Sequence, residues 1–161
     1  MRGFWKEFFK HSAVLTVTIF LQFVYINILP KQLTSADLFL LIACFYVLKA
    51  DYKVGFTYVF VSVLFDEIIF PASKIIGVKT LPAIVLGYVF YLIFRKMVLK
   101  GYLVCLTAAS YSVLTIAFSK LLAIFVGAGG KTGSLYDYIS LFVITFVLSC
   151  LAEKKLNVWR E

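Results

Sequence analysis

The chain has 161 residues, of which 63% are hydrophobic and only 15% are charged. An ordinary soluble domain is nearer to half apolar and one quarter charged, so the composition excludes most soluble folds and predicts a polytopic membrane protein. The net charge of +8 does not indicate nucleic-acid binding, because the basic residues stand singly or in pairs between apolar runs.

Apolar runs separated by polar breaks predict an all-α protein, with six transmembrane helices in one domain over residues 1–161. The expected spans are about residues 12–29, 35–50, 54–70, 75–94, 101–119 and 135–152. A helix needs about 20 residues to cross the hydrocarbon core, so the second and fourth spans are long enough only at these widest limits. The fifth span can continue past Lys120 to Val126 as a tilted helix whose lysine reaches the headgroups.

The positions of the basic residues predict an orientation. Six spans would place eleven of the 16 on one side: Arg2, Lys6, Lys10, Lys49, Lys53, Arg95, Lys96, Lys100, Lys154, Lys155 and Arg160. The other side would keep Lys31, Lys74, Lys79, Lys120 and Lys131. Because cytoplasmic loops carry an excess of Lys and Arg, we expect both termini in the cytoplasm.

Two adjacent acids, Asp66 and Glu67, stand far into the third span, and Asp66 is about 18 Å from its start at 1.5 Å per residue. Ionisable groups at membrane depth normally face protein or a water-filled cavity and mark functional sites. The alternative is that the helix ends near Phe65 and the acids lie at the outer interface. If they are buried, one carboxyl stays protonated, or Lys74 or Lys79 neutralises it. Adjacent helical positions point about 100° apart, so the pair is not expected to face one narrow site or act as catalytic acid and base.

Other polar residues have simpler interpretations. Asp37 precedes the second span, where a helix N-cap is favoured over a ligand contact, and Asp137 opens the sixth span in the same way. Glu153 is expected to be a surface charge among lysines. His11, the only histidine, is expected at the cytoplasmic interface.

Small residues on one face of the fifth span predict close helix packing. They recur at helical spacing: Ala108, Ser112, Thr115 and Ser119. Packing within the chain is favoured, and docking of a partner helix is the alternative. Gly77 and Gly87 are expected to serve similarly around the fourth span.

The sequence contains no recognisable catalytic or cofactor motif. It lacks a phosphate loop in the required order, a nucleophile elbow and a His-based metal motif. Cys44, Cys105 and Cys150 lie far apart inside apolar runs, which favours buried packing over a metal site or a disulfide framework. We therefore expect no enzyme activity, no cofactor and no metal.

The order of features from residue 36 to residue 96 resembles the bacterial rod-shape-determining protein family MreD. The features are Ala36-Asp37-Leu38, Gly55-Phe56, Asp66, Gly77-Val78-Lys79-Thr80-Leu81, Gly87-Tyr88 and Arg95-Lys96. The chain departs from the family at Ala36, where a proline is usual, and at Tyr58 and Ser62, where glycine is frequent. The interval from Asp66 to Gly77 is also a few residues long.

The resemblance implies a non-enzymatic scaffold in the inner membrane, within the cell-wall elongation complex. Such a protein binds MreC and is linked through it to the peptidoglycan polymerase, its penicillin-binding protein and MreB filaments. The family is similar in fold to the substrate-binding subunits of energy-coupling-factor vitamin transporters. The candidate partner-binding or structural residues are Asp37, Gly55, Phe56, Asp66, Glu67, Gly77, Gly87, Tyr88, Ala108 and Ser112.

Two other functions stay open from the sequence. A vitamin-uptake subunit would need polar groups that converge on an external pocket, and it would usually carry a small-residue docking motif that Ser12 to Leu29 lacks. A membrane enzyme would require Asp37 and Asp66 to converge in a closed cavity.

Overall fold

The computed structural model describes residues 2–28, 37–49, 52–71, 75–94, 101–128 and 134–157. These residues form six helices and no strand, which confirms the all-α prediction. The helices are α1 (Arg2–Ile28), α2 (Leu38–Lys49), α3 (Tyr52–Ile69), α4 (Thr80–Phe94), α5 (Tyr102–Phe125) and α6 (Leu135–Asn157). Residues 1, 29–36, 50–51, 72–74, 95–100, 129–133 and 158–161 lie outside the described part of the chain. The predictions about seven basic residues therefore lie outside it too: Lys31, Lys74, Arg95, Lys96, Lys100, Lys131 and Arg160.

Three helices in the described part of the chain are long and apolar enough to cross a membrane: Lys10–Ile28 of α1, Tyr102–Phe125 of α5 and Leu135–Glu153 of α6. The other three differ from the expected spans. With 12 and 15 residues, α2 and α4 are only about 18 and 22 Å long at 1.5 Å per residue. The uncharged run of α3, residues 54–65, is short because Lys53 lies near one end of the helix and Asp66 and Glu67 lie near the other.

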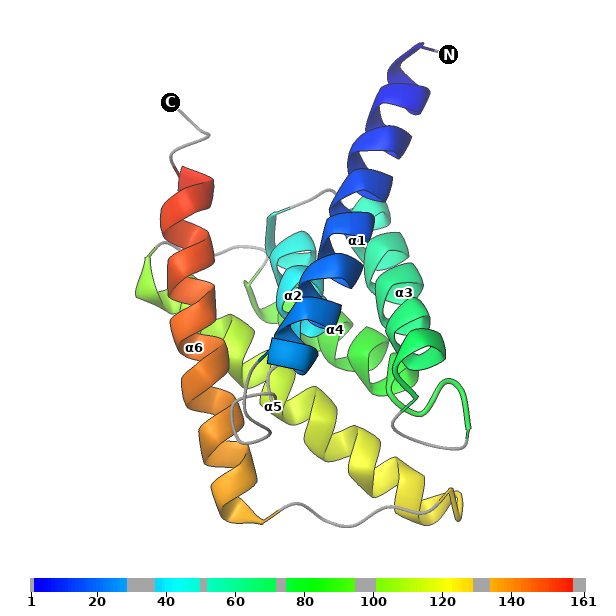
Figure 1. The fold of residues 1–161 in the computed structure, drawn as a ribbon, viewed down its shortest axis with the longest axis vertical. Helices are drawn as coiled ribbons and strands as arrows, with labels where there is room; N and C mark the ends of the chain where they lie inside the picture. Colours follow the sequence, from blue (N-terminus) through cyan, green and yellow to red (C-terminus); the bar gives the residue numbers. More distant parts are fainter. Residues whose placement is uncertain are drawn as a thin grey trace.

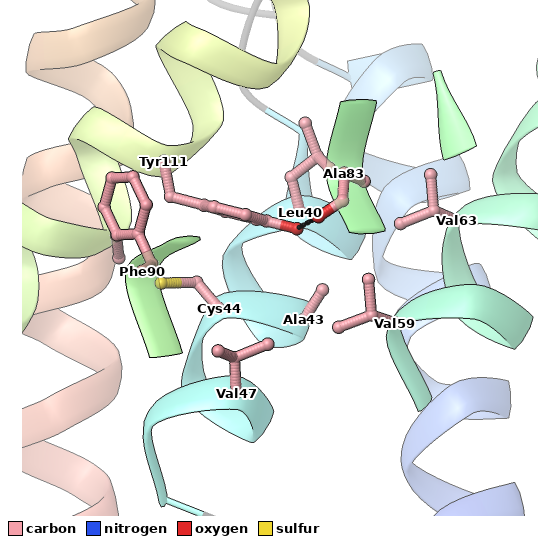
Figure 2. Close-up of a cluster of buried hydrophobic side chains, with 10 residues drawn as sticks. Leu40, Ala43, Cys44, Val47, Val59, Val63, Ala83, Phe90 and Tyr111 are labelled. Carbon is pink, nitrogen blue, oxygen red and sulfur yellow. Dashed lines mark hydrogen bonds between the residues drawn. The ribbon is translucent and has the colours of Figure 1, made fainter. Parts of the chain in front are cut away.

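The short helix α2 lies at the centre of the molecule, in contact with α1, α3, α4 and α5. Its side chains Leu40, Ala43, Cys44 and Val47 pack with residues of α3, α4 and α5 in the main hydrophobic cluster (Figure 2). In the same cluster the Tyr111 hydroxyl of α5 donates a hydrogen bond to the Ala83 carbonyl of α4 at 2.8 Å. Because protein covers α2 on most sides, the helix is apolar all round rather than amphipathic.

The first residues of α1 and the last residues of α6 lie at the same end of the molecule, and the two helices stand apart (Figure 1). The long helix α5 runs obliquely and packs along α6. It continues past Lys120 to Phe125 as expected, and the Lys120 ammonium lies 5.0 Å from the centre of the Tyr138 ring on α6. Large apolar side chains such as Phe20, Leu81 and Tyr136 remain exposed.

The first turns of α6 and α4 contain residues that favour the start of a helix. At α6, Ser134 is the N-cap: its hydroxyl accepts the Asp137 N–H at 3.3 Å, and the Asp137 carboxylate accepts the Ser134 N–H at 2.7 Å. The prediction of Asp137 as the N-cap is wrong by three positions, because this reciprocal pair is a capping box. At α4, Pro82 lies in the first turn, where its missing N–H would have no helical partner.

The turn before α4 is fixed by packing against the end of α5. Gly77 has a φ of +99°, a conformation that favours glycine. Val78 packs with Ala123 and Ala128, and the Ala128 N–H closes the end of α5 by bonding to the Ala123 carbonyl at 2.9 Å. This contact holds the segment that carries Lys79.

Candidate functional site

A lysine joins two acids that are distant in sequence. Lys79 lies just before α4, and its ammonium donates hydrogen bonds to Oδ2 of Asp37, before α2, and to Oδ2 of Asp66, in the last turn of α3. Both carboxylates are buried, with relative exposures of 7% for Asp37 and 3% for Asp66. We call these three residues the acid–lysine cluster. The cluster connects the ends of three helices through charge-assisted hydrogen bonds.

Glu67 contacts the backbone of the same turn instead of the ammonium. Its carboxylate accepts the N–H groups of Gly77 at 2.9 Å, Lys79 at 2.5 Å and Thr80 at 3.3 Å, and the Thr80 hydroxyl at 2.5 Å. These donors begin α4, where unpaired N–H groups and the helix dipole favour a negative charge. Glu67 therefore caps α4 from outside the helix, and these backbone and hydroxyl donors satisfy its buried carboxylate.

Asp37 is the N-cap of α2, as predicted. Its Oδ1 accepts the N–H groups of Phe39 at 2.9 Å and Leu40 at 3.2 Å, and Oδ2 stays available for Lys79. The N–H of Leu38, the first residue of α2, donates to Oε1 of the buried Gln22 of α1 at 3.0 Å. The N-cap prediction is confirmed, and the second carboxylate oxygen binds the Lys79 ammonium.

The structure shows where α3 ends and what buries Asp66 and Glu67. Helix α3 continues to Ile69 and ends before Pro71, so an end near Phe65 is wrong. Both carboxylates are buried by protein, and Lys79 is the residue that neutralises Asp66. Both acids contact the turn before α4: Asp66 binds the side chain of Lys79, and Glu67 binds its backbone.

The contacts between α2, α3 and α4 involve Gly55 and Phe56 of α3 and Gly87 and Tyr88 of α4. A Cβ on Gly55 of α3 would lie 2.9 Å from the Tyr46 carbonyl oxygen of α2, so these helices approach closely only with glycine there. A Cβ on Gly87 of α4 would meet Val47 at 3.6 Å, an ordinary contact. The Phe56 and Tyr88 rings meet edge to face, with centroids 6.1 Å apart.

The small-residue face of α5 is turned into the protein. Ala108, Ser112 and Thr115 are fully buried, and α5 packs there on its neighbours within the chain. Among the described residues, the buried hydroxyls of Ser112 and of Thr145 on α6 have no hydrogen-bond partner. A partner helix would have to displace part of this chain to reach Ala108 or Ser112.

Sequence reasoning missed two polar contacts between helices. Nδ1 of His11 lies 2.8 Å from the Tyr46 hydroxyl, and the Tyr46 ring stacks on Tyr58 with centroids 3.8 Å apart. Glu153, expected at the surface, is 5% exposed and accepts the Gly101 N–H at 3.0 Å. No local pattern marks these pairs, because their members are 35 and 52 residues apart.

The fold and the cluster define a class: an all-helical protein with three helices of membrane-spanning length and a buried, charge-paired junction between shorter helices. No group of three or more His, Cys, Asp or Glu that could hold a metal ion occurs among the described residues. No family model, curated protein or solved structure matches the chain.

Proposed function

We propose that this chain is a non-enzymatic scaffold of the bacterial cell-wall elongation complex, related to MreD and bound to an MreC-like membrane protein. It lies in the inner membrane with six spans and both termini in the cytoplasm, in a fold similar to that of vitamin-transporter substrate-binding subunits. Through its partner it is linked to the peptidoglycan polymerase, the penicillin-binding protein and MreB filaments. Its basic residues attract anionic lipids, and it binds no nucleic acid.

The observation that supports the proposal is that several of the ordered features within the described residues meet in space. Asp37 and Asp66 share Lys79, Gly55 lies against α2, and Phe56 contacts Tyr88. The polar groups of the cluster are used in contacts between α2, α3 and α4, an arrangement suited to holding helices in a fixed relation. A scaffold needs such rigidity, because partner helices dock by close van der Waals fit.

Short helices are compatible with six spans when other helices shield them. The central helix α2 has most of its side chains buried by protein, so it need not match the bilayer thickness on its own. The start of α1 and the end of α6 lie at one end of the molecule, as an even number of crossings requires (Figure 1).

Co-expression with an MreC-like protein tests the proposal. We expect the tagged chain to retain that protein through detergent purification, and we expect deletion of the gene to convert rods to spheres. A control bait, an unrelated membrane protein of similar size, should retain none. A chain that purifies without the partner, together with normal rod shape after deletion, would contradict the scaffold function.

The convergence of Asp37 and Asp66 favours one second candidate, a small-molecule uptake subunit. In that case Lys79 and the two acids would line a binding site, and a vitamin would raise the thermal stability of the purified chain. That increase would be lost in Asp66→Ala. Stabilisation by any member of a vitamin panel, combined with no retention of an MreC-like protein, would favour the transporter over the scaffold.

A further inference from the structure

The acid–lysine cluster contains more negative than positive groups. Lys79 brings one ammonium to two carboxylates, those of Asp37 and Asp66, and both carboxylates are buried. With both acids ionised, the three side chains keep one negative charge in excess. A buried charge without a counter-charge is expensive, and two carboxylates at one site do not ionise together readily. The binding of one proton would remove the excess charge without displacing Lys79.

The hydrogen bonds of the two acids differ, and the difference identifies the acid that receives the proton. Oδ1 of Asp37 accepts two N–H groups at the start of α2, where the helix dipole also favours an anion. Within the described part of the chain, the donor to the Asp66 carboxylate is Lys79. Asp66 also lies in the last turn of α3, where the helix dipole disfavours a negative charge. The structure therefore supports an anion better at Asp37 than at Asp66.

The elements packed on α3 add no other cation at Asp66 among the described contacts. Helices α1, α2 and α4 pack on α3. The segment before α2 contributes Asp37, the turn before α4 contributes Lys79, and α1 contributes the neutral Gln22 beside the start of α2. On α3 itself the next residue is Glu67, whose carboxylate is bound to the start of α4. Acids thus outnumber the ammonium around Asp66.

We propose that Asp66 is a proton-operated switch at the junction of α2, α3 and α4. When Asp66 is ionised, it shares Lys79 with Asp37, and the ammonium ties the end of α3 to the turn before α4. Uptake of a proton from the aqueous medium removes the charge of Asp66, so the ammonium binds Asp37 as its remaining carboxylate. The end of α3 then keeps the contact of Glu67 with the turn and loses that of Asp66.

The switch goes beyond the proposed function and does not depend on the identity of a partner. In the orientation of that proposal, α1 crosses the membrane once before the chain reaches Asp37, so the cluster faces the outer side. Acidification of the exterior would then loosen α3 from the turn before α4. The side that is sensed rests on the proposed function, whereas proton binding at Asp66 does not.

Infrared spectroscopy of the purified full chain in detergent tests proton binding. A protonated carboxyl has a carbonyl stretching band that a carboxylate lacks. We expect this band to appear in the wild type at a less acidic pH than the bands of exposed acids, and to be missing in Asp66→Asn, whose amide has the shape of the neutral acid. The matched control Asp137→Asn, which removes an exposed acid, should keep the band. Persistence of the band in Asp66→Asn would overturn the proposal.

A second variant changes the charge balance and leaves Asp66 in place. Asp37→Asn pairs one carboxylate with one ammonium, and asparagine caps a helix about as well as aspartate. The band of Asp66 should therefore appear at a more acidic pH, with a shift of about 1–3 pH units. This measurement decides the proposal if Asp66→Asn fails to fold, because an unshifted band would contradict a shared ammonium.

Hydrogen exchange measures the consequence for α3. After correction for the intrinsic pH dependence of amide exchange, the last turn of α3 should exchange faster in the wild type once the band of Asp66 has appeared. In Asp66→Asn, the same turn should exchange at the faster rate throughout this pH range. A corrected rate that is independent of pH in the wild type would refute the switch. Both measurements use the chain alone, so a failure to retain an MreC-like protein would not change their outcome.

Discussion

Two regions bury carboxylates between helices, and they stabilise them by different means. At the α2–α3–α4 junction, Lys79 supplies an ammonium to Asp37 and Asp66. At the α5–α6 contact, the described partners of Glu153 are one backbone N–H and a thiol. The first region depends on charge balance, because removal of the Lys79 ammonium leaves Asp37 and Asp66 as buried anions. The second depends on neutral donors at the start of α5, which packs on its neighbours through small side chains.

The strongest test of this difference is removal of the cation. Lys79→Met should destabilise the chain by about 3–5 kcal/mol, since breaking a buried ion pair leaves uncompensated charge. The free energy of unfolding in detergent measures the effect. Adding Asp37→Asn and Asp66→Asn to Lys79→Met should recover much of the loss. If the single variant is as stable as the wild type, charge balance does not hold the junction together.

Glu67 tests the role of backbone donors within the same junction. Glu67→Ala removes the acceptor of three N–H groups and should cost about 2–3 kcal/mol, because buried donors left unpaired are expensive. Glu67→Gln keeps one carbonyl oxygen and should lose less. Hydrogen exchange at the start of α4 should rise in Glu67→Ala. Equal losses in the two variants would show that negative charge, rather than hydrogen bonding, is what α4 requires.

Ser112 tests the fit of the small-residue face of α5. Ser112→Leu adds volume at a fully buried position and should cost about 1–3 kcal/mol through overpacking. Ser112→Ala, the matched control, removes a hydroxyl without a hydrogen-bond partner and should change stability by less than about 0.5 kcal/mol. Thermal unfolding of both proteins in the same detergent compares them. A tolerated leucine would mean that the small-residue face of α5 is loosely packed.

Gly55 tests how closely α2 and α3 approach each other, and we expect its substitution to have the smallest effect on stability. Gly55→Ala places a methyl group 2.9 Å from the Tyr46 carbonyl oxygen and should cost about 1 kcal/mol, since two backbones must separate. Gly87→Ala, with its nearest neighbour at 3.6 Å, should be neutral or slightly stabilising in the helix. Thermal midpoints distinguish the two variants. The opposite ranking would contradict the tight contact of α2 with α3.

Local signals were sufficient for the helices and for the cap at Asp37. The apolar runs predicted all six helices, although α1 begins at Arg2 rather than at residue 12 because polar residues extend it beyond its apolar run. An acid before such a run satisfies the first N–H groups from within its own segment. At α6 the same reasoning placed the cap at Asp137 instead of Ser134, because both members of a capping box are good cap residues. Glu153 was misassigned because its charged neighbours in sequence suggested solvent, whereas its contacts come from the start of α5.

The sequence by itself determined that this chain is helical and rich enough in apolar residues for a membrane, because both properties depend on composition and on neighbours within a few residues. It also identified Asp66 and Glu67 as acids whose position far into an expected span needs an explanation. Only the tertiary structure decided that Lys79 lies between Asp37 and Asp66, and that Glu67 caps a helix beginning 13 residues later. Those partners are joined by how α2, α3 and α4 pack, and no short-range pattern records which distant ends will meet.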